Sequence, residues 1–109
     1  MAYSTTLAAR IRARMADRDG VVEKKMFGGI AFLLHGNMCV GVVGDDLCAR
    51  VGKGAYADLS EEPGARPMDF TGRPMKGWLF IDAGVVADDA VLLTWIERCE
   101  RFVQTLPRK

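Results

Sequence analysis

The sequence has few residues of the kinds that mark disulfide-bonded, zinc-binding or membrane-spanning proteins. Its 109 residues include three cysteines, Cys39, Cys48 and Cys99, an odd number without a Cys-x-x-Cys spacing. This pattern argues against a disulfide framework or a zinc site and is typical of reduced thiols. No apolar run is long enough to span a bilayer, and no basic segment followed by an apolar stretch opens the chain. We therefore expect a cytoplasmic protein without a membrane partner.

Groups that carry catalysis are also scarce. The single histidine, His35, precedes Gly36-Asn37, and a polar residue at a turn needs no chemical explanation. Cys39 would form a nucleophilic pair with it across that turn, but buried cysteines usually behave as small hydrophobes. Asp45-Asp46 lacks further oxygen ligands at a useful spacing, and Gly28-Gly29 lacks a phosphate-loop pattern. We predict no catalytic residue, no metal, no cofactor and no enzymatic activity.

The chain has no excess of charge of one sign. Fifteen Lys and Arg face 14 Asp and Glu, a formal net charge of +1, which gives no overall field toward nucleic acid. The first quarter is nevertheless basic and the last quarter acidic. An alternative nucleic-acid contact would use five cations, namely the helical "arginine row" Arg10, Arg14 and Arg18 together with Lys24 and Lys25. We expect solvated surfaces here and no specific binding of DNA or RNA.

The sequence is rich in apolar residues, which make up 50% of the chain, and the pairs Gly28-Gly29 and Gly36-Asn37 separate short apolar runs. At this length it should form one domain, residues 1–109, with its own core. Helical and strand-like spacing of the apolar residues predicts an α+β fold in the order α-β-β-β-β-α-β-β-α, with a mostly antiparallel sheet. The predicted elements are a helix over 4–18, strands over 21–27, 30–35, 38–43 and 47–51, a helix over 55–62, extended segments over 67–70 and 76–81, and a helix from Asp88 or Asp89 to Pro107.

The two terminal helices carry apolar stripes that only the sheet can cover. We predict one shared core containing Leu7, Ile11, Phe32, Leu34, Trp95, Ile96, Phe102 and Val103. The run from Ile30 to Leu34 is apolar on both faces of its strand. Because one layer of helices covers one face, we expect a second copy of the chain on the other face, as a homodimer.

Two stretches of the sequence resemble the N-terminal domain of the TfoX (Sxy) family. They are Met26-Phe27-Gly28-Gly29 followed by Gly36-Asn37-Met38, and the block Arg66-Pro67-Met68-Asp69-Phe70-Thr71-Gly72-Arg73-Pro74-Met75-Lys76-Gly77-Trp78. The similarity extends through nearly the whole chain. It implies the two-layer, secretion-chaperone-like architecture of that family. It also implies a regulatory role, because the family is associated with control of natural competence in bacteria.

The second block is the candidate interaction site. Its cations, Arg66, Arg73 and Lys76, lie close in sequence to Phe70 and Trp78, in a segment that prolines stiffen. Loops held by a rigid scaffold are favoured places for recognition. The alternative is a structural clip over the edge of the sheet, and the residues alone do not decide between the two.

The resemblance implies a module and not a complete regulator. In the competence regulators a second domain, which resembles helix-hairpin-helix modules, follows the N-terminal one, and we expect this chain to correspond to the N-terminal module. The favoured function is a non-enzymatic regulatory or protein-interaction module with an unknown protein partner. The alternatives are a small nucleic-acid-binding protein and, third, a small-ligand-binding protein or an enzyme.

Overall fold

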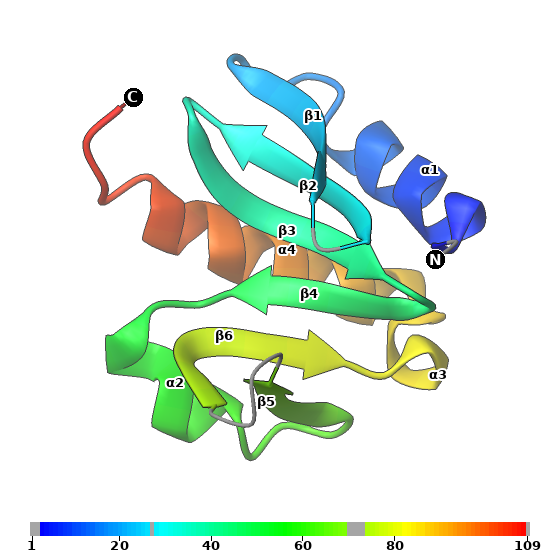
Figure 1. Ribbon diagram of the computed structural model, residues 1–109, viewed down its shortest axis with the longest axis vertical. Coiled ribbons are helices and arrows are strands. Elements are labelled where there is room, and N and C mark those ends of the chain that lie inside the picture. Colours follow the sequence, from blue (N-terminus) through cyan, green and yellow to red (C-terminus); the bar gives the residue numbers. More distant parts are fainter. Residues whose placement is uncertain (1–2, 27, 70–73, 109) are drawn as a thin grey trace.

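The fold is a six-stranded antiparallel sheet with helices on one side (Figure 1). The computed structural model describes residues 3–26, 28–69 and 74–108, without the side chains of 68, 69, 74 and 75. The sheet order is β1-β2-β3-β4-β6-β5. The elements in chain order are α1 (Thr5–Arg14), β1 (Val21–Met26), β2 (Gly29–Leu34), β3 (Asn37–Val43), β4 (Asp46–Arg50), α2 (Lys53–Leu59), β5 (Ala65–Asp69), β6 (Pro74–Ile81), α3 (Ala83–Val86) and α4 (Asp89–Val103).

The helices α1 and α4 lie together on one face of the sheet, behind it in Figure 1, and α2 lies beside the start of β6. Strands β1 to β4 form a meander of consecutive antiparallel pairs, and β6 then pairs with β4. In the described part of the chain no helix covers the opposite face of the sheet. The α+β prediction is confirmed, and the architecture is a two-layer sandwich.

The predicted core is confirmed in its main members. Seven of the eight predicted core residues are buried in one cluster between the helices and the sheet, namely Leu7, Ile11, Phe32, Leu34, Trp95, Ile96 and Val103. Phe102 differs, because it is half-buried at the edge of that cluster. Its ring lies against Gly52 and the Arg50 guanidinium instead of the sheet interior.

Most element bounds differ from the sequence prediction by a few residues; for example, α2 spans Lys53–Leu59 and not 55–62, and α4 ends at Val103 and not at Pro107. Three further differences matter for the fold. A one-turn helix, α3, precedes α4, so the chain ends in two helices. The first helix ends at Arg14 and not at residue 18. The β2–β3 turn is His35-Gly36, with φ of 52° and 85°, and not Gly36-Asn37. Asn37 instead begins β3 as a buried residue, and its amide Nδ2 donates to the Pro107 carbonyl at 2.9 Å, which fixes this register.

Among the described residues no helix combines the length and apolar character that crossing a membrane would require.

Candidate protein-interaction face

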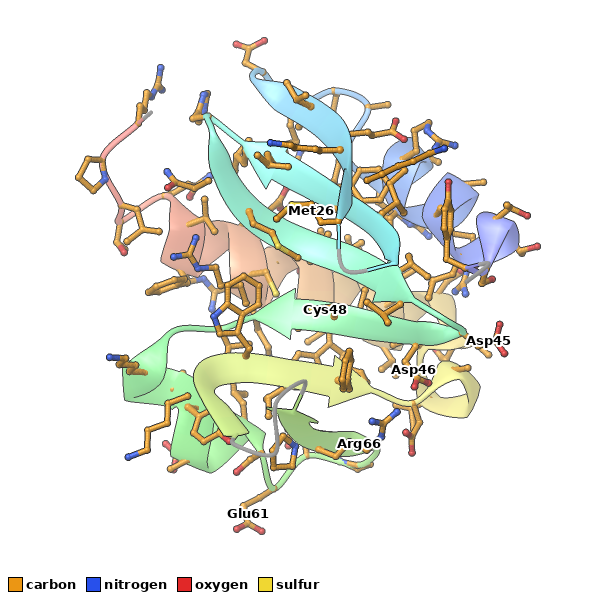
Figure 2. All side chains as sticks on the ribbon, viewed as in Figure 1. Met26, Asp45, Asp46, Cys48, Glu61 and Arg66 are labelled. Carbon is orange, nitrogen blue, oxygen red and sulfur yellow. The ribbon has the colours of Figure 1, made fainter. Side chains whose placement is uncertain are left out.

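The face of the sheet opposite α1 and α4 carries its own small apolar cluster, and we call it the helix-free face. Side chains alternate between the two faces along each strand, and the strand register aligns those on this face in rows across the sheet. Figure 2 views the molecule from this side, with Met26 and Cys48 on the near face. The central row, from edge to edge, is Lys24, Ala31, Gly41, Cys48, Phe80 and Arg66.

This row has an apolar centre and charged ends. Ala31, Cys48 and Phe80 are buried, and half-buried residues pack around them, namely Met26, Leu33, Val43 and Trp78. Val22, on the edge strand β1, is 59% exposed and is the one large exposed hydrophobic residue in the described part of the chain. An apolar centre with a charged rim is the composition typical of protein–protein interfaces.

Arg66, from the predicted interaction block, is committed to contacts within the molecule. Its Nε donates to Asp82 at 3.0 Å, and its Nη2 forms an ion pair with Asp46. The guanidinium also lies over the Phe80 ring, 5.1 Å from the centroid. Asp46 in addition accepts from the backbone N–H of Ala83 at 3.2 Å, at the start of α3. Arg66 thus clips the edge strand β5 to the ends of β4 and β6.

The other members of that block do not stay with Arg66. Lys76 and Trp78 lie nearer the start of β6, beside Arg50 of β4. Phe70 and Arg73 lie outside the described residues. The sequence prediction did not include Arg50. The only signal for it in the sequence is that it is the single charged residue in the apolar run that ends before Gly52.

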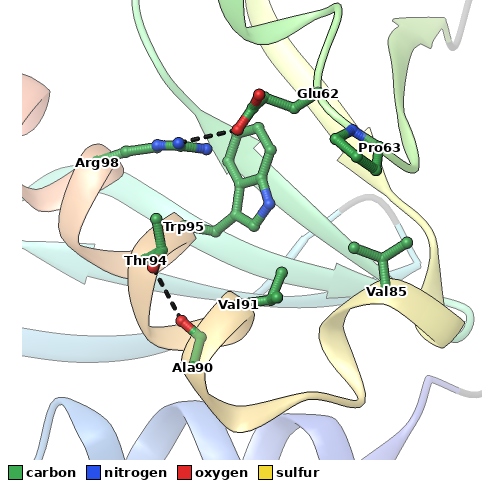
Figure 3. Close-up of a pocket in the computed structure, with 8 residues that line it drawn as sticks. All are labelled: Glu62, Pro63, Val85, Ala90, Val91, Thr94, Trp95 and Arg98. Carbon is green, nitrogen blue, oxygen red and sulfur yellow. Dashed lines mark hydrogen bonds and ion pairs between the residues drawn. The ribbon is translucent and has the colours of Figure 1, made fainter.

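A second feature is the pocket of about 250 Å³ between α4 and the α2–β5 connection (Figure 3). The Trp95 indole forms one wall, and the Arg98 guanidinium lies 4.7 Å from its ring centroid. Arg98 Nη2 donates to Glu62 at 2.9 Å and ties the two segments together above the ring. Small-molecule sites usually enclose about 300–1,000 Å³, and here the cation is already paired. We interpret this pocket as a packing seam.

The arginine row does not form a free cationic surface. Arg10 pairs with Asp89 at 2.7 Å, and this hydrogen bond lowers the pKa of Asp89 below its ordinary value. Arg18 pairs with the buried Glu100 at 2.9 Å, and that hydrogen bond raises the pKa of Arg18. Both carboxylates belong to α4, so two acidic residues of the last quarter neutralise two of the three arginines of the row. Arg14 is exposed on α1.

The two lysines of the same candidate site are exposed on β1 but point to opposite faces of the sheet. Lys24 pairs in register with Ala31 of the helix-free face, whereas Lys25 pairs with Ile30 of the helix-covered core. The five cations therefore do not share one surface.

The thiols are buried and poorly suited to nucleophilic chemistry. Desolvation raises the pKa of Cys39 and of Cys48 to about 12, and raises that of the fully buried Cys99 well above its ordinary value. A thiol of such high pKa is almost entirely protonated near neutral pH and is a weak nucleophile. Within residues 3–26, 28–69 and 74–108, no group of three or more His, Cys, Asp or Glu side chains could hold a metal ion.

One comparison with known proteins gives a match. The family model described as the TfoX N-terminal domain matches residues 13–103, which is most of the chain and includes every strand of the sheet together with α4. No curated protein and no solved structure matches the chain.

Proposed function

The chain belongs to the TfoX N-terminal domain family, and on that premise we propose that it is a regulatory protein-interaction module that acts by binding and not by catalysis. The proposed regulation is of the kind associated with bacterial competence. The docking surface is the helix-free face, and its occupant is a second copy of the same chain.

The observation that carries this proposal is the apolar centre of the helix-free face. Helices cover one side of the sheet, while the other side exposes part of Met26, Leu33, Val43 and Trp78 around a buried centre. A two-fold axis through the face would bring two such centres together and remove this surface from water. Ala31, Gly41 and Cys48 are already buried within one chain, so the contact surface comes from the half-buried side chains around them.

Binding in place of catalysis is supported by the state of the reactive groups. The thiols are buried with raised pKa values, and His35 occupies a tight turn at the end of β2. At one end of the central row Arg66 serves structure, since it is held by Asp46 and Asp82.

The proposal is tested by sedimentation equilibrium at micromolar concentration. The wild-type chain should show twice the 12.0 kDa mass of one copy. Val22→Lys adds a charge beside Leu33 on the helix-free face, and the dimer should dissociate at a concentration at least about tenfold higher, because burying an unpaired charge is costly. Val22 is mostly exposed, so the variant should still fold.

The matched control is Ala13→Lys, which adds the same charge at an exposed position of α1 on the far side of the sheet. It should leave the dimer unchanged. A monomer mass for the wild-type chain, or equal weakening by both variants, would contradict the proposal.

A further inference from the structure

A cationic pocket lies where β4 ends and α2 begins, and we call it the Arg50 pocket. Its volume is about 390 Å³, within the range usual for small-molecule sites. Three cations line it, Arg50, Lys53 and Lys76, together with the rings of Trp78 and Phe102. In the described part of the chain none of its lining residues is acidic. This composition differs from the pocket beside Trp95, where Glu62 pairs with the arginine.

Arg50 is held in place by aromatic rings and a backbone carbonyl, without a counter-charge from the described residues. Its guanidinium carbon lies 5.2 Å from the centroid of the Trp78 ring and 5.6 Å from that of Phe102. Its Nη1 donates to the Met38 carbonyl at 3.3 Å. No carboxylate pairs with Arg50 among the residues that the structure describes. Five other arginines, Arg10, Arg12, Arg18, Arg66 and Arg98, each have an acidic partner.

The backbone that shapes this pocket depends on two glycines. The N–H groups of Val51 and Gly52 both donate to the Gly77 carbonyl, at 2.8 and 3.1 Å, which joins the end of β4 to β6. Gly77 has a φ of 95°, and a Cβ on it would lie 3.2 Å from the Gly52 carbonyl carbon. The close approach brings Lys53, at the start of α2, and Lys76, on β6, to the same opening.

We propose that the Arg50 pocket binds a small phosphomonoester whose organic part packs beside Trp78. A guanidinium offers a planar fork of donors that matches phosphate oxygens, and ring stacking has already ordered this one. The two exposed lysines add charge for a dianion without the cost of desolvation. The pocket lies beside the helix-free face and shares Trp78 with it, but its three cations lie outside the apolar centre of that face, and the inference does not rest on dimer formation.

Phenyl phosphate is the probe, titrated into the full ¹⁵N-labelled chain and followed by NMR and by calorimetry. We expect saturable one-to-one binding, with amide shifts that concentrate at 52–54 and 76–78. Phenol, which lacks the phosphate, should give no shifts there. Failure of phenyl phosphate to bind at millimolar concentration, or shifts that concentrate elsewhere, would overturn the proposal.

Variants assign the binding to the pocket. Arg50→Gln should weaken phenyl phosphate binding at least about tenfold, since it removes charge-assisted hydrogen bonds. Lys53→Gln with Lys76→Gln changes only exposed residues, so its comparable loss cannot come from unfolding. Arg14→Gln, an exposed arginine on α1, is the matched control and should bind as the wild type does. Equal weakening by Arg14→Gln would show general charge attraction and overturn the assignment, whereas Val22→Lys should leave the binding unchanged.

Discussion

Replacing Gly52 by Ala should destabilise the protein strongly, for two reasons that the structure separates. Gly52 has φ 84° and ψ 156°, a backbone region essentially confined to glycine that costs other residues about 1–3 kcal/mol. A Cβ there would also lie 2.4 Å from Cδ1 of the Phe102 ring, and overpacking of this kind costs a further ~1–3 kcal/mol. The expected loss in the free energy of unfolding is therefore about 2–6 kcal/mol, a large part of the ~5–15 kcal/mol typical of a domain.

The assay is urea denaturation followed by circular dichroism, with linear extrapolation to water. Gly54→Ala, two residues away, is the control. Among the described atoms nothing lies within 4 Å of a Cβ at Gly54, which is inside α2, so alanine should stabilise the protein by about 0.5–1 kcal/mol. In a Phe102→Ala background the Gly52→Ala loss should shrink, because the ring that the new Cβ would meet is absent and the backbone term remains. Equal effects of the two alanines, or a Gly52→Ala loss below about 0.5 kcal/mol, would refute the reasoning.

Three further predictions concern the core, the thiols and nucleic acid. Trp95→Ala should lower the free energy of unfolding by about 3–5 kcal/mol, because the indole is 2% exposed, whereas the exposed Thr94→Ala should change it by less than ~0.5 kcal/mol; similar urea midpoints for the two would show that α4 does not dock. The three thiols should react with a disulfide reagent at pH 8 only after unfolding, because burial raises their pKa values, and rapid labelling of the native chain would contradict that. Fluorescence anisotropy at physiological salt should give DNA binding no tighter than ~10⁻⁴–10⁻⁶ M; nanomolar binding that is lost when the arginine row is replaced by Gln would favour the nucleic-acid alternative.

Much of the fold could be predicted because local signals and the global fold agree. The extended runs separated by turns that contain glycine form β1 to β4. The apolar stripe of the last helix forms α4, which is capped by Asp88, whose carboxylate accepts from the N–H groups of Ala90 and Val91. The one-turn helix α3 could not be predicted, because four residues are too few to reveal a helical period. The β2–β3 turn was misplaced by one residue because its register depends on Asn37 and Pro107, which are 70 positions apart.

The candidate sites were less predictable because they depend on contacts between distant segments. The arginine row has helical spacing that the sequence reveals, but its neutralising partners are 79 and 82 residues away, in α4. Arg66 and Lys76 are ten residues apart in one block, yet one is paired within the sheet and the other lines a pocket. Arg50 could not be singled out from the sequence, because the two aromatic rings that contact it, Trp78 and Phe102, are far from it along the chain. The absence of an acid beside it among the described residues is likewise visible only in the structure.

The most direct test of the proposed docking face is an isotope-filtered NOE experiment on a mixture of labelled and unlabelled copies of the chain. It detects contacts between copies at the level of single methyl groups. The account predicts intermolecular NOEs that involve Leu33, Met38 and Val43 of the helix-free face. Intermolecular NOEs confined to α1 or α4 would contradict it. So would the absence of any intermolecular NOE at a concentration where the labelled chain is fully paired with unlabelled copies.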